Sequence, residues 1–179
     1  MTTYIALLRG INVGGKNKID MKQLKAAFAA AGFADTRTYI NSGNVIFSSD
    51  KDATAVQAAC EALIAERFAL NIAVAVLSAA ELAEALDNAP HWWGNDPEAK
   101  HNAIFIIPPA TAEHVCLEVG AIKPEYEKCA YYGRLIFWSA PLKTFSQTRW
   151  ATVSKHATYQ KITIRNSTTA YKLRELSRE

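Results

Sequence analysis

Hydrophobic residues recur with two different periods over the first 78 positions, and these periods predict six secondary-structure elements. A short apolar run predicts a strand over residues 3–8, the turn residues 41–43 predict a hairpin of strands 36–40 and 44–48, and an alternating pattern predicts a strand over residues 71–77. Apolar residues spaced three and four positions apart predict helices over residues 21–31 and 53–69. Asp20 is the predicted N-cap of the first helix, and Gly32 is its predicted C′ residue. The order is strand, helix, strand, strand, helix, strand.

The same order returns in the second half of the chain. Ser78 is expected to cap a short helix ending near Leu86, and residues 88–100 have the Pro, Gly and Asp content of a linker. In the remaining chain, strands are predicted over residues 102–107, 128–132, 134–138 and 161–164. Helices are predicted over residues 112–119, 145–159 and 167–176. We therefore divide the chain into unit one (1–78), a connecting helix and linker (79–100), and unit two (101–179).

The predicted fold class is α+β, with two consecutive ferredoxin-like βαββαβ units packed together and a C-terminal helix. Such a unit is an antiparallel sheet with strand order 4-1-3-2 and helices on one face. The predicted strands are apolar on both faces, so we expect both faces of each sheet to be covered. In this topology the end of the first strand and the turn between the second and third strands share one sheet edge. The loop 9–18 should therefore lie beside residues 41–44.

That loop carries the chemistry most typical of a binding site. Gly10, Gly14 and Gly15 allow close backbone approach to a ligand, while Arg9, Lys16 and Lys18 supply positive charge, which suits an anion. Gly10 to Lys16 also matches the start of the nucleotide-binding pattern GxxxxGK[ST]. We interpret that match as coincidental, because Asn17 replaces the hydroxyl residue and no helix follows directly.

The segment Tyr39 to Asn44 adds two amides, a hydroxyl and a phenol where the loop is expected. Asn, Ser and Gly are also favoured in tight turns for conformational reasons alone, so a purely structural role stays open.

Charge is unevenly distributed along the chain. Residues 1–18 carry three basic and no acidic side chains, and residues 143–179 carry eight basic and two acidic ones. The middle holds nine basic and fifteen acidic residues. If the two ends meet, they form a positive patch that attracts phosphates or carboxylates; otherwise they form two separate solvated faces. The basic C-terminal segment alternatively indicates a module that binds nucleic acid or protein.

Other residue types restrict the chemistry further. Cys60, Cys116 and Cys129 lack CxxC spacing and fall within predicted elements, so we expect buried thiols of a reducing compartment. Neither a metal site nor a cofactor is predicted, and the absence of a secretion signal or an apolar span leads us to expect a cytoplasmic protein without membrane contact. His91-Trp92-Trp93 suits either an aromatic ligand platform or, more commonly, the filling of a seam between two domains.

The run LLRGINVGGKNKIDMKQLKAAFAAAGFADTRTYINSGNVIF, together with TIRNSTTAYKL near the C-terminus, resembles the bacterial family numbered 1697 in the domain-of-unknown-function series. The resemblance extends over essentially the whole chain. It implies a pair of ferredoxin-like halves and supplies no activity, cofactor or catalytic residue. It also implies that Arg9, Asn12, Gly14, Gly15, Lys16, Tyr39, Ser42, Gly43, Asn44, Arg165 and Asn166 occupy signature positions.

From these observations we expect a small phosphate-bearing ligand, such as a nucleotide or a sugar phosphate, to bind where the loop meets the turn. Arg165 is either a bidentate anion clamp or the partner of an acidic side chain. The predicted ligand-binding residues are Arg9, Asn12, Gly14, Gly15, Lys16, Lys18, Tyr39, Asn41, Ser42, Asn44, Arg165 and Asn166.

Overall fold

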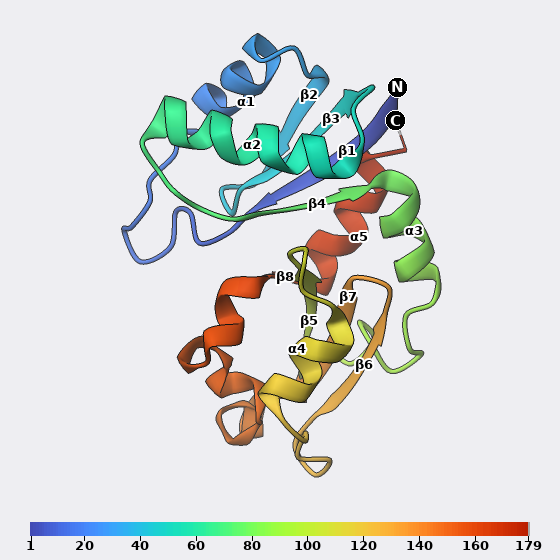
Figure 1. Ribbon diagram of the computed structural model, residues 1–179. Helices are drawn as coiled ribbons and strands as arrows, with labels where there is room; N and C mark the ends of the chain where they lie inside the picture. Colours follow the sequence, from blue (N-terminus) through green and yellow to red (C-terminus); the bar gives the residue numbers. More distant parts are fainter. Residues whose placement is uncertain (179) are drawn as a thin grey trace. The chain divides into compact units, whose positions relative to one another are not determined.

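The computed structural model describes residues 1–178 and divides into two compact units (Figure 1). Unit 1 comprises Met1–Leu82 together with the stretch from Leu173 on, and unit 2 comprises Ala83–Lys172. Each unit contains one four-stranded antiparallel sheet. The protein is therefore α+β, with an arrangement that fits a duplicated ferredoxin-like fold.

Unit 1 follows the predicted order of elements. They are β1 (Thr2–Leu8), α1 (Met21–Ala30), β2 (Ala34–Tyr39), β3 (Asn44–Ser49), α2 (Ala53–Phe68) and β4 (Val74–Ser78). The strands lie in the order β2-β3-β1-β4, and every neighbouring pair is antiparallel. Helices α1 and α2 lie on the same face of this sheet (Figure 1), where Leu24, Phe28, Cys60 and Ile64 pack with Phe47 and Val76 in one apolar core.

Local sequence sets the helix boundaries in unit 1. The Asp20 carboxylate accepts hydrogen bonds from the backbone N–H groups of Lys22 and Gln23, each at 2.9 Å, so Asp20 is the N-cap that the sequence predicts. Gly32, two residues beyond the end of α1, has φ +88°, a conformation that glycine adopts without steric cost.

Unit 2 repeats the plan after α3 (Ala79–Asp87), whose first turn is capped by the Ser78 hydroxyl. Its elements are β5 (Ala99–Ile106), α4 (Ala112–Val119), β6 (Lys128–Tyr132), β7 (Leu135–Pro141), three 3-10 segments, β8 (Ile162–Asn166) and α5 (Ser167–Leu176). The strand order is β6-β7-β5-β8, which is the order of unit 1 shifted by four strands. Residues 103–106 of β5 are all buried, so both faces of this strand are covered, as expected.

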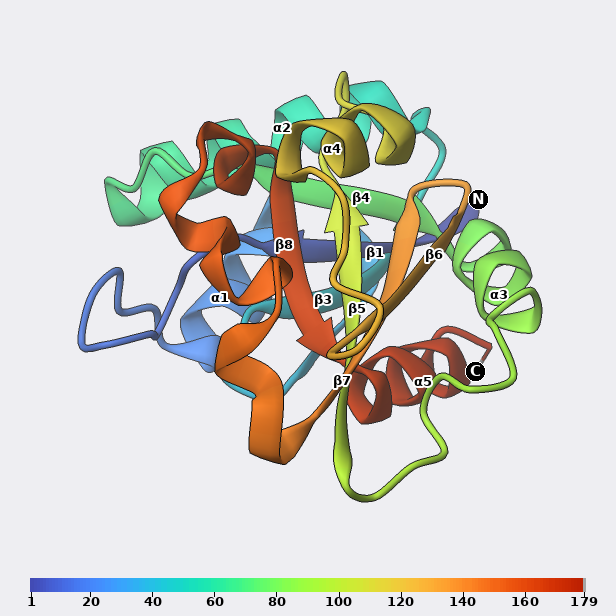
Figure 2. The same cartoon turned by 90° about the horizontal axis from the view of Figure 1, so that it is seen from below.

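One predicted element of unit 2 takes a different form. The single helix expected over residues 145–159 is three 3-10 segments, η1 (Leu142–Gln147), η2 (Trp150–Lys155) and η3 (Ala157–Lys161). They follow one another along the chain (Figure 2); η1 contacts β7, and η3 contacts β8. The hydroxyls of Thr148 and Thr152 donate to backbone carbonyls three residues earlier, at 2.7 and 2.8 Å. Such side-chain bonds compete with regular helical bonding and explain why the α-helix does not form.

Aromatic residues fill both faces of the unit 2 sheet. Trp93 is buried, its ring lies 5.0 Å from that of Phe137 and 5.6 Å from that of Tyr171, and its indole N–H donates to the Asn102 carbonyl at 3.0 Å. Trp93 is thus a core residue of unit 2. On the opposite face Trp138 belongs to the core formed with α4 and η2.

The cysteines differ from expectation. Cys60 on α2 is buried, but Cys116 on α4 and Cys129 on β6 are half-buried, so the prediction of three buried thiols is wrong for these two. Both lie at the margin of the unit 2 core, next to residues that are fully enclosed.

Candidate functional site

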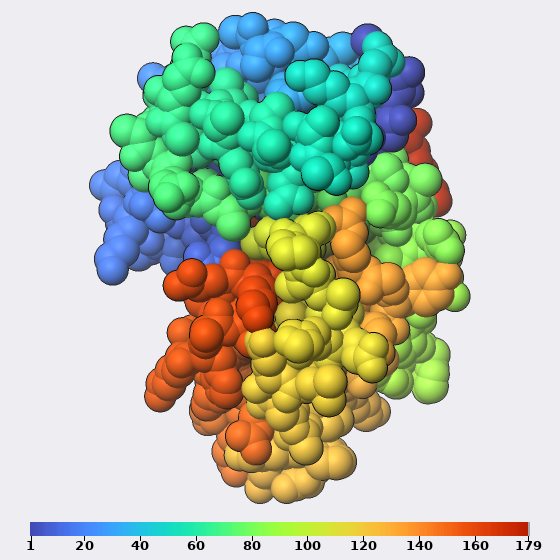
Figure 3. All heavy atoms as spheres, viewed as in Figure 1, coloured from blue at the N-terminus to red at the C-terminus, as the bar shows by residue number. Residues whose placement is uncertain are grey.

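The loop 9–18 of unit 1 is a small β-hairpin with anchored ends and an exposed tip. Ile11 and Ile19 are buried in the core, whereas residues 13–18 are exposed. The N–H of Asn12 donates to the Asn17 carbonyl at 3.2 Å, and that of Lys16 donates to the Val13 carbonyl at 3.0 Å. The loop projects from unit 1 in two views and forms a protruding blue lobe in the space-filling view (Figures 1, 2 and 3).

Gly14 and Gly15 form the central pair of this hairpin. Their φ angles are +59° and +74°, and a two-residue turn with both central residues in the left-handed region is the type that matches the twist of a β-hairpin. The glycines therefore have a conformational role. The segment is also not a P-loop, because α1 begins only at Met21 and the Asn17 amide donates to the Gly10 carbonyl within the loop.

Asn12 fastens the loop to the neighbouring turn. Its side-chain amide donates to the carbonyls of Ile19 at 3.0 Å and Asn41 at 2.8 Å, and its oxygen accepts from the N–H of Ile19 at 2.8 Å. The loop and the turn thus lie side by side, as the topology predicts. Since all three contacts are internal, the Asn12 side chain has a structural role at the junction of loop and turn.

The turn 40–43 between β2 and β3 approaches the loop closely at Gly43. The N–H of Leu8 donates to the Gly43 carbonyl at 2.8 Å. A Cβ atom added to Gly43 would lie 2.7 Å from Cδ1 of Ile11 and 2.9 Å from Cβ of Leu8. Glycine is therefore required here both for space and for its φ of +85°.

The remaining polar residues of the turn mostly hold its shape. Asn44 is buried, and its amide donates to the Tyr39 carbonyl and the Ser42 hydroxyl, each at 2.9 Å. Asn41 is exposed, and its side-chain amide has no hydrogen-bond partner within residues 1–178. Asn41 is consequently the residue of this turn that can offer its side chain to a ligand.

The loop, the start of α1 and Asn41 of the turn line an open hollow of about 440 Å³. Lys16 at the tip and Lys18 at the wall are exposed, and neither forms an ion pair with any described residue. The one acidic lining residue, Asp20, already accepts two N–H groups of α1. The hollow is lined by Asn12, Gly15, Lys18, Ile19, Asp20, Met21 and Asn41.

Two predicted site residues, Arg165 and Asn166, belong to unit 2. Arg165 is buried, donates to the Thr163 hydroxyl and the Ile164 carbonyl at 2.9 Å each, and has its pKa lowered to about 10 by burial. The Asn166 side chain accepts from the N–H of Thr169 at 2.7 Å and caps α5. Neither residue lines the hollow of unit 1.

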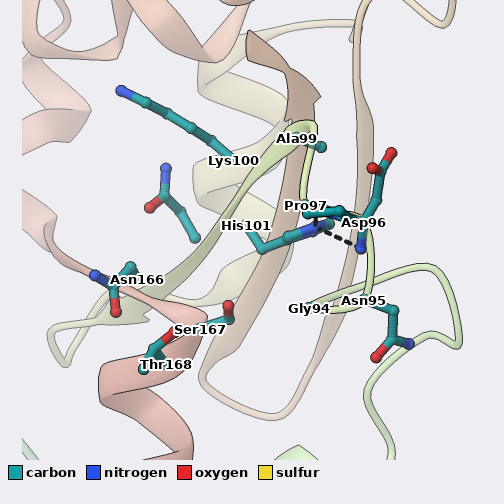
Figure 4. Close-up of a pocket in the computed structure, with 11 residues that line it drawn as sticks. Gly94, Asn95, Asp96, Pro97, Ala99, Lys100, His101, Asn166, Ser167 and Thr168 are labelled. Atoms are coloured by element: carbon teal, nitrogen blue, oxygen red, sulfur yellow. Dashed lines mark hydrogen bonds between the residues drawn. The ribbon is translucent and has the colours of Figure 1, made fainter.

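Asn166 lines a larger hollow of about 780 Å³ in unit 2 (Figure 4). The segment Gly94 to Pro97 lies on one side of His101, and the start of α5 lies on the other. Lys100 extends away from the histidine, and its ammonium lies 4.3 Å from the centre of the Phe145 ring. The lining residues are Gly94, Asn95, Asp96, Pro97, Ala99, Lys100, His101, Asn102, Asn166, Ser167 and Thr168.

His101 and Ser139 form a polar pair that the sequence analysis missed. The Nδ1 atom of His101 lies 2.6 Å from the Ser139 hydroxyl, and its Nε2 atom lies 2.8 Å from the Asp96 carbonyl. If Nε2 carries the proton and donates to that carbonyl, Nδ1 accepts from the hydroxyl. The two residues are cross-strand partners on β5 and β7. Pairing the predicted strands 102–107 and 134–138 in an extended register would have revealed the contact. Both side chains line a cavity of about 170 Å³.

Residues 1–178 contain no cluster of three or more His, Cys, Asp or Glu side chains arranged to hold a metal ion. No helix in this range has both the length and the apolar character needed to cross a membrane.

Comparison with known proteins identifies the family. A comparison with curated proteins finds no match. The chain is similar to the solved structure of the conserved bacterial protein SP0830 from Streptococcus pneumoniae, with 31% identity over 98% of each chain and a TM-score of 0.88. The family profile described as "Protein of unknown function (DUF1697)" matches residues 1–137, which is most of the chain. The chain therefore belongs to the DUF1697 family.

Proposed function

We propose that unit 1 binds a small phosphate-bearing ligand in the hollow between the loop 9–18 and the turn 40–43. The observation that carries the proposal is the Asn12 side chain, which ties a lysine-bearing hairpin to a turn that offers a further amide. The lysines are thus presented beside the hollow on a fixed scaffold. A ligand that meets preorganised groups loses less free energy to ordering them.

The groups available to a ligand are chiefly donors. Lys16 and Lys18 contribute ammonium groups, and Asn41 contributes a side-chain amide. The backbone N–H groups of Gly14 and Gly15 form no hydrogen bond with any described residue. Ammonium and N–H donors match the acceptor oxygens of a phosphate, and bonds to a charged partner are about twice as strong as neutral ones.

Asp20 and Ile40 refine the proposal. An acidic side chain at the wall disfavours a bare polyphosphate but accepts hydrogen bonds from hydroxyls, so we expect a phosphate attached to a sugar. Ile40 has φ +48°, which is strained for a β-branched residue. Strain of this kind is concentrated at binding sites and active sites, which supports a functional role for the turn.

Isothermal titration with inorganic phosphate, a pentose phosphate and a nucleoside monophosphate tests the proposal. The double variant Lys16→Ala/Lys18→Ala should bind the preferred probe roughly 10-fold more weakly, or weaker still, because two charge-assisted contacts are lost. The control is Lys25→Ala/Lys51→Ala, which removes the same charge from exposed positions of unit 1 outside the hollow. Equal weakening in both double variants, or wild-type protein that binds no probe at millimolar concentration, would contradict the proposal.

The alternative of nucleic-acid binding through the basic C-terminal segment has less support. Lys161 already pairs with Glu118 at 2.7 Å, and Arg165 is buried, so neither cation is readily available to a phosphate backbone. Titration with a single-stranded oligonucleotide at two salt concentrations addresses it, because phosphate contacts weaken steeply with salt.

A further inference from the structure

Cys116 and Cys129 bring two thiols together in unit 2. Cys116 lies on α4 and Cys129 on β6, and the Cys129 thiol is hydrogen-bonded to that of Cys116. The two elements are in contact, and both side chains are half-buried beside the same apolar core. The thiols are thus close to each other without being sealed from solvent.

The hydrogen bond makes the two thiols unequal. Donation from Cys129 stabilises a Cys116 thiolate and lowers the pKa of Cys116, while burial acts against this. The same bond, together with burial, raises the pKa of Cys129, because Cys129 holds the shared proton. A thiolate is the reactive form of cysteine, so Cys116, the thiol with the lowered pKa, is the better suited of the two to attack a disulfide.

Cys60 provides an internal contrast. It is fully buried on α2, and burial, with a smaller contribution from Glu61, raises its pKa to about 12. It therefore has little thiolate at neutral pH and is hidden from reagents. Any chemistry specific to the pair should leave Cys60 unchanged.

We propose that Cys116 and Cys129 form a thiol–disulfide exchange site whose substrate class is small-molecule disulfides. The Cys116 thiolate attacks one sulfur of the external disulfide, whose S–S bond breaks and releases one thiolate, which takes up a proton. Cys129 then loses its proton and attacks the Cys116 sulfur, and a second thiol leaves. The two protein thiols lose two electrons in total, and the external disulfide gains them as two thiols.

The disulfide would act on the segment between the two cysteines. This segment comprises residues 117–128, and part of it, including Pro124 and Tyr126, lines the cavity of His101 and Ser139. A covalent link between α4 and β6 restricts the freedom of the unfolded chain, and a loop of this length gives a substantial stabilisation. The redox state of the pair thus sets how firmly one wall of that cavity is held.

Oxidation of the native protein by oxidised glutathione, followed by peptide mapping in a mass spectrometer, tests the site. We expect a Cys116–Cys129 disulfide, an unmodified Cys60, and a Tm about 5 °C or more above that of the reduced protein. Cys129 is the cross-strand partner of Trp138, so formation of the disulfide should also change the tryptophan fluorescence. Dithiothreitol should reverse all three changes.

Variants separate the roles of the two thiols. Cys129→Ser should accumulate glutathione on Cys116, whereas Cys116→Ser should acquire little at Cys129. Cys60→Ser serves as the matched control and should form the disulfide as fast as wild type. A wild-type map without the Cys116–Cys129 linkage, or modification of Cys60 at a rate equal to that of Cys116, would overturn the proposal.

Discussion

The two units share a strand order but differ in the connection between their first strand and first helix. In unit 1, residues 9–20 join β1 to α1, whereas in unit 2 only residues 107–111 join β5 to α4. Connections of two to six residues are usual in such units, so the short one already satisfies the topology. The additional residues in unit 1 are therefore not needed to build the sheet, and they carry the exposed lysines and the hairpin.

The hollows of the two units differ in the same sense. Each lining contains one lysine and one aspartate, and the unit 2 hollow is the larger of the two. In unit 1, Lys18 has no ion-pair partner among the described residues and Asp20 already accepts two N–H groups of α1, whereas in unit 2 the Lys100 ammonium lies over the Phe145 ring. Lys18 is thus the more available of the two lysines, which is why we place the anion site in unit 1.

The largest effect on stability should come from Gly43. Gly43 and Gly133 lie in the equivalent turns of units 1 and 2, but their surroundings differ. Gly43→Ala should destabilise the protein by roughly 3 kcal/mol, since the new Cβ clashes with Ile11 and Leu8 and the residue has a left-handed φ. Gly133→Ala, with φ +55° and no atom within 4 Å, should cost about 1 kcal/mol. Urea denaturation of both variants measures the difference.

Equal losses of unfolding free energy in the two glycine variants would show that the close packing of the loop against the turn contributes little to stability. The expected difference would instead locate the tight contact in unit 1 alone.

The second-largest effect on stability should come from Asn12, whose side-chain amide holds the loop 9–18 against the turn 40–43. Asn12→Ala should cost roughly 2–3 kcal/mol, because three hydrogen bonds are lost and the backbone groups of Ile19 and Asn41 lose their partner. Asn17→Ala is the matched control, since Asn17 also has a left-handed φ but donates only one side-chain bond. It should cost about 1 kcal/mol.

Phosphate titration of the same two variants sharpens the result. If Asn12 positions the lysines, its loss should weaken binding more than the loss of Asn17. Equal binding of phosphate by both variants would mean that the Asn12 contacts stabilise the loop but do not position the lysines for a ligand.

Much of the fold follows from the sequence because each signal is local. Periodicity predicted α4 with the bounds the structure has, and Asp20 and Ser78 predicted helix starts through their capping bonds. The error in residues 142–161 has a local cause as well, because threonine side chains compete for the backbone carbonyls there. Residue type alone did not reveal this competition.

The site was less predictable because it depends on which groups are already engaged. The sequence could place the loop beside the turn, but it could not show that the amides of Asn12 and Asn44 are used internally. The pairs His101–Ser139 and Cys116–Cys129 join distant positions through strand register and helix packing. Neither leaves a spacing motif in the chain.

The smallest effect on stability should come from Ile40. Here we expect the free energy of unfolding to rise while phosphate binding weakens, so the two measurements distinguish a role in stability from a role in binding. Ile40→Gly relieves a left-handed β-branched residue, worth about 1–2 kcal/mol, against a cost of roughly 0.5–1 kcal/mol for the greater freedom of glycine when unfolded. We expect a net gain of up to about 1 kcal/mol in urea denaturation. Ile40→Val keeps the strain and should show no gain. If the strained turn holds Asn41 toward the hollow, Ile40→Gly should bind phosphate more weakly although it is more stable; unchanged binding would mean that the strain serves no ligand.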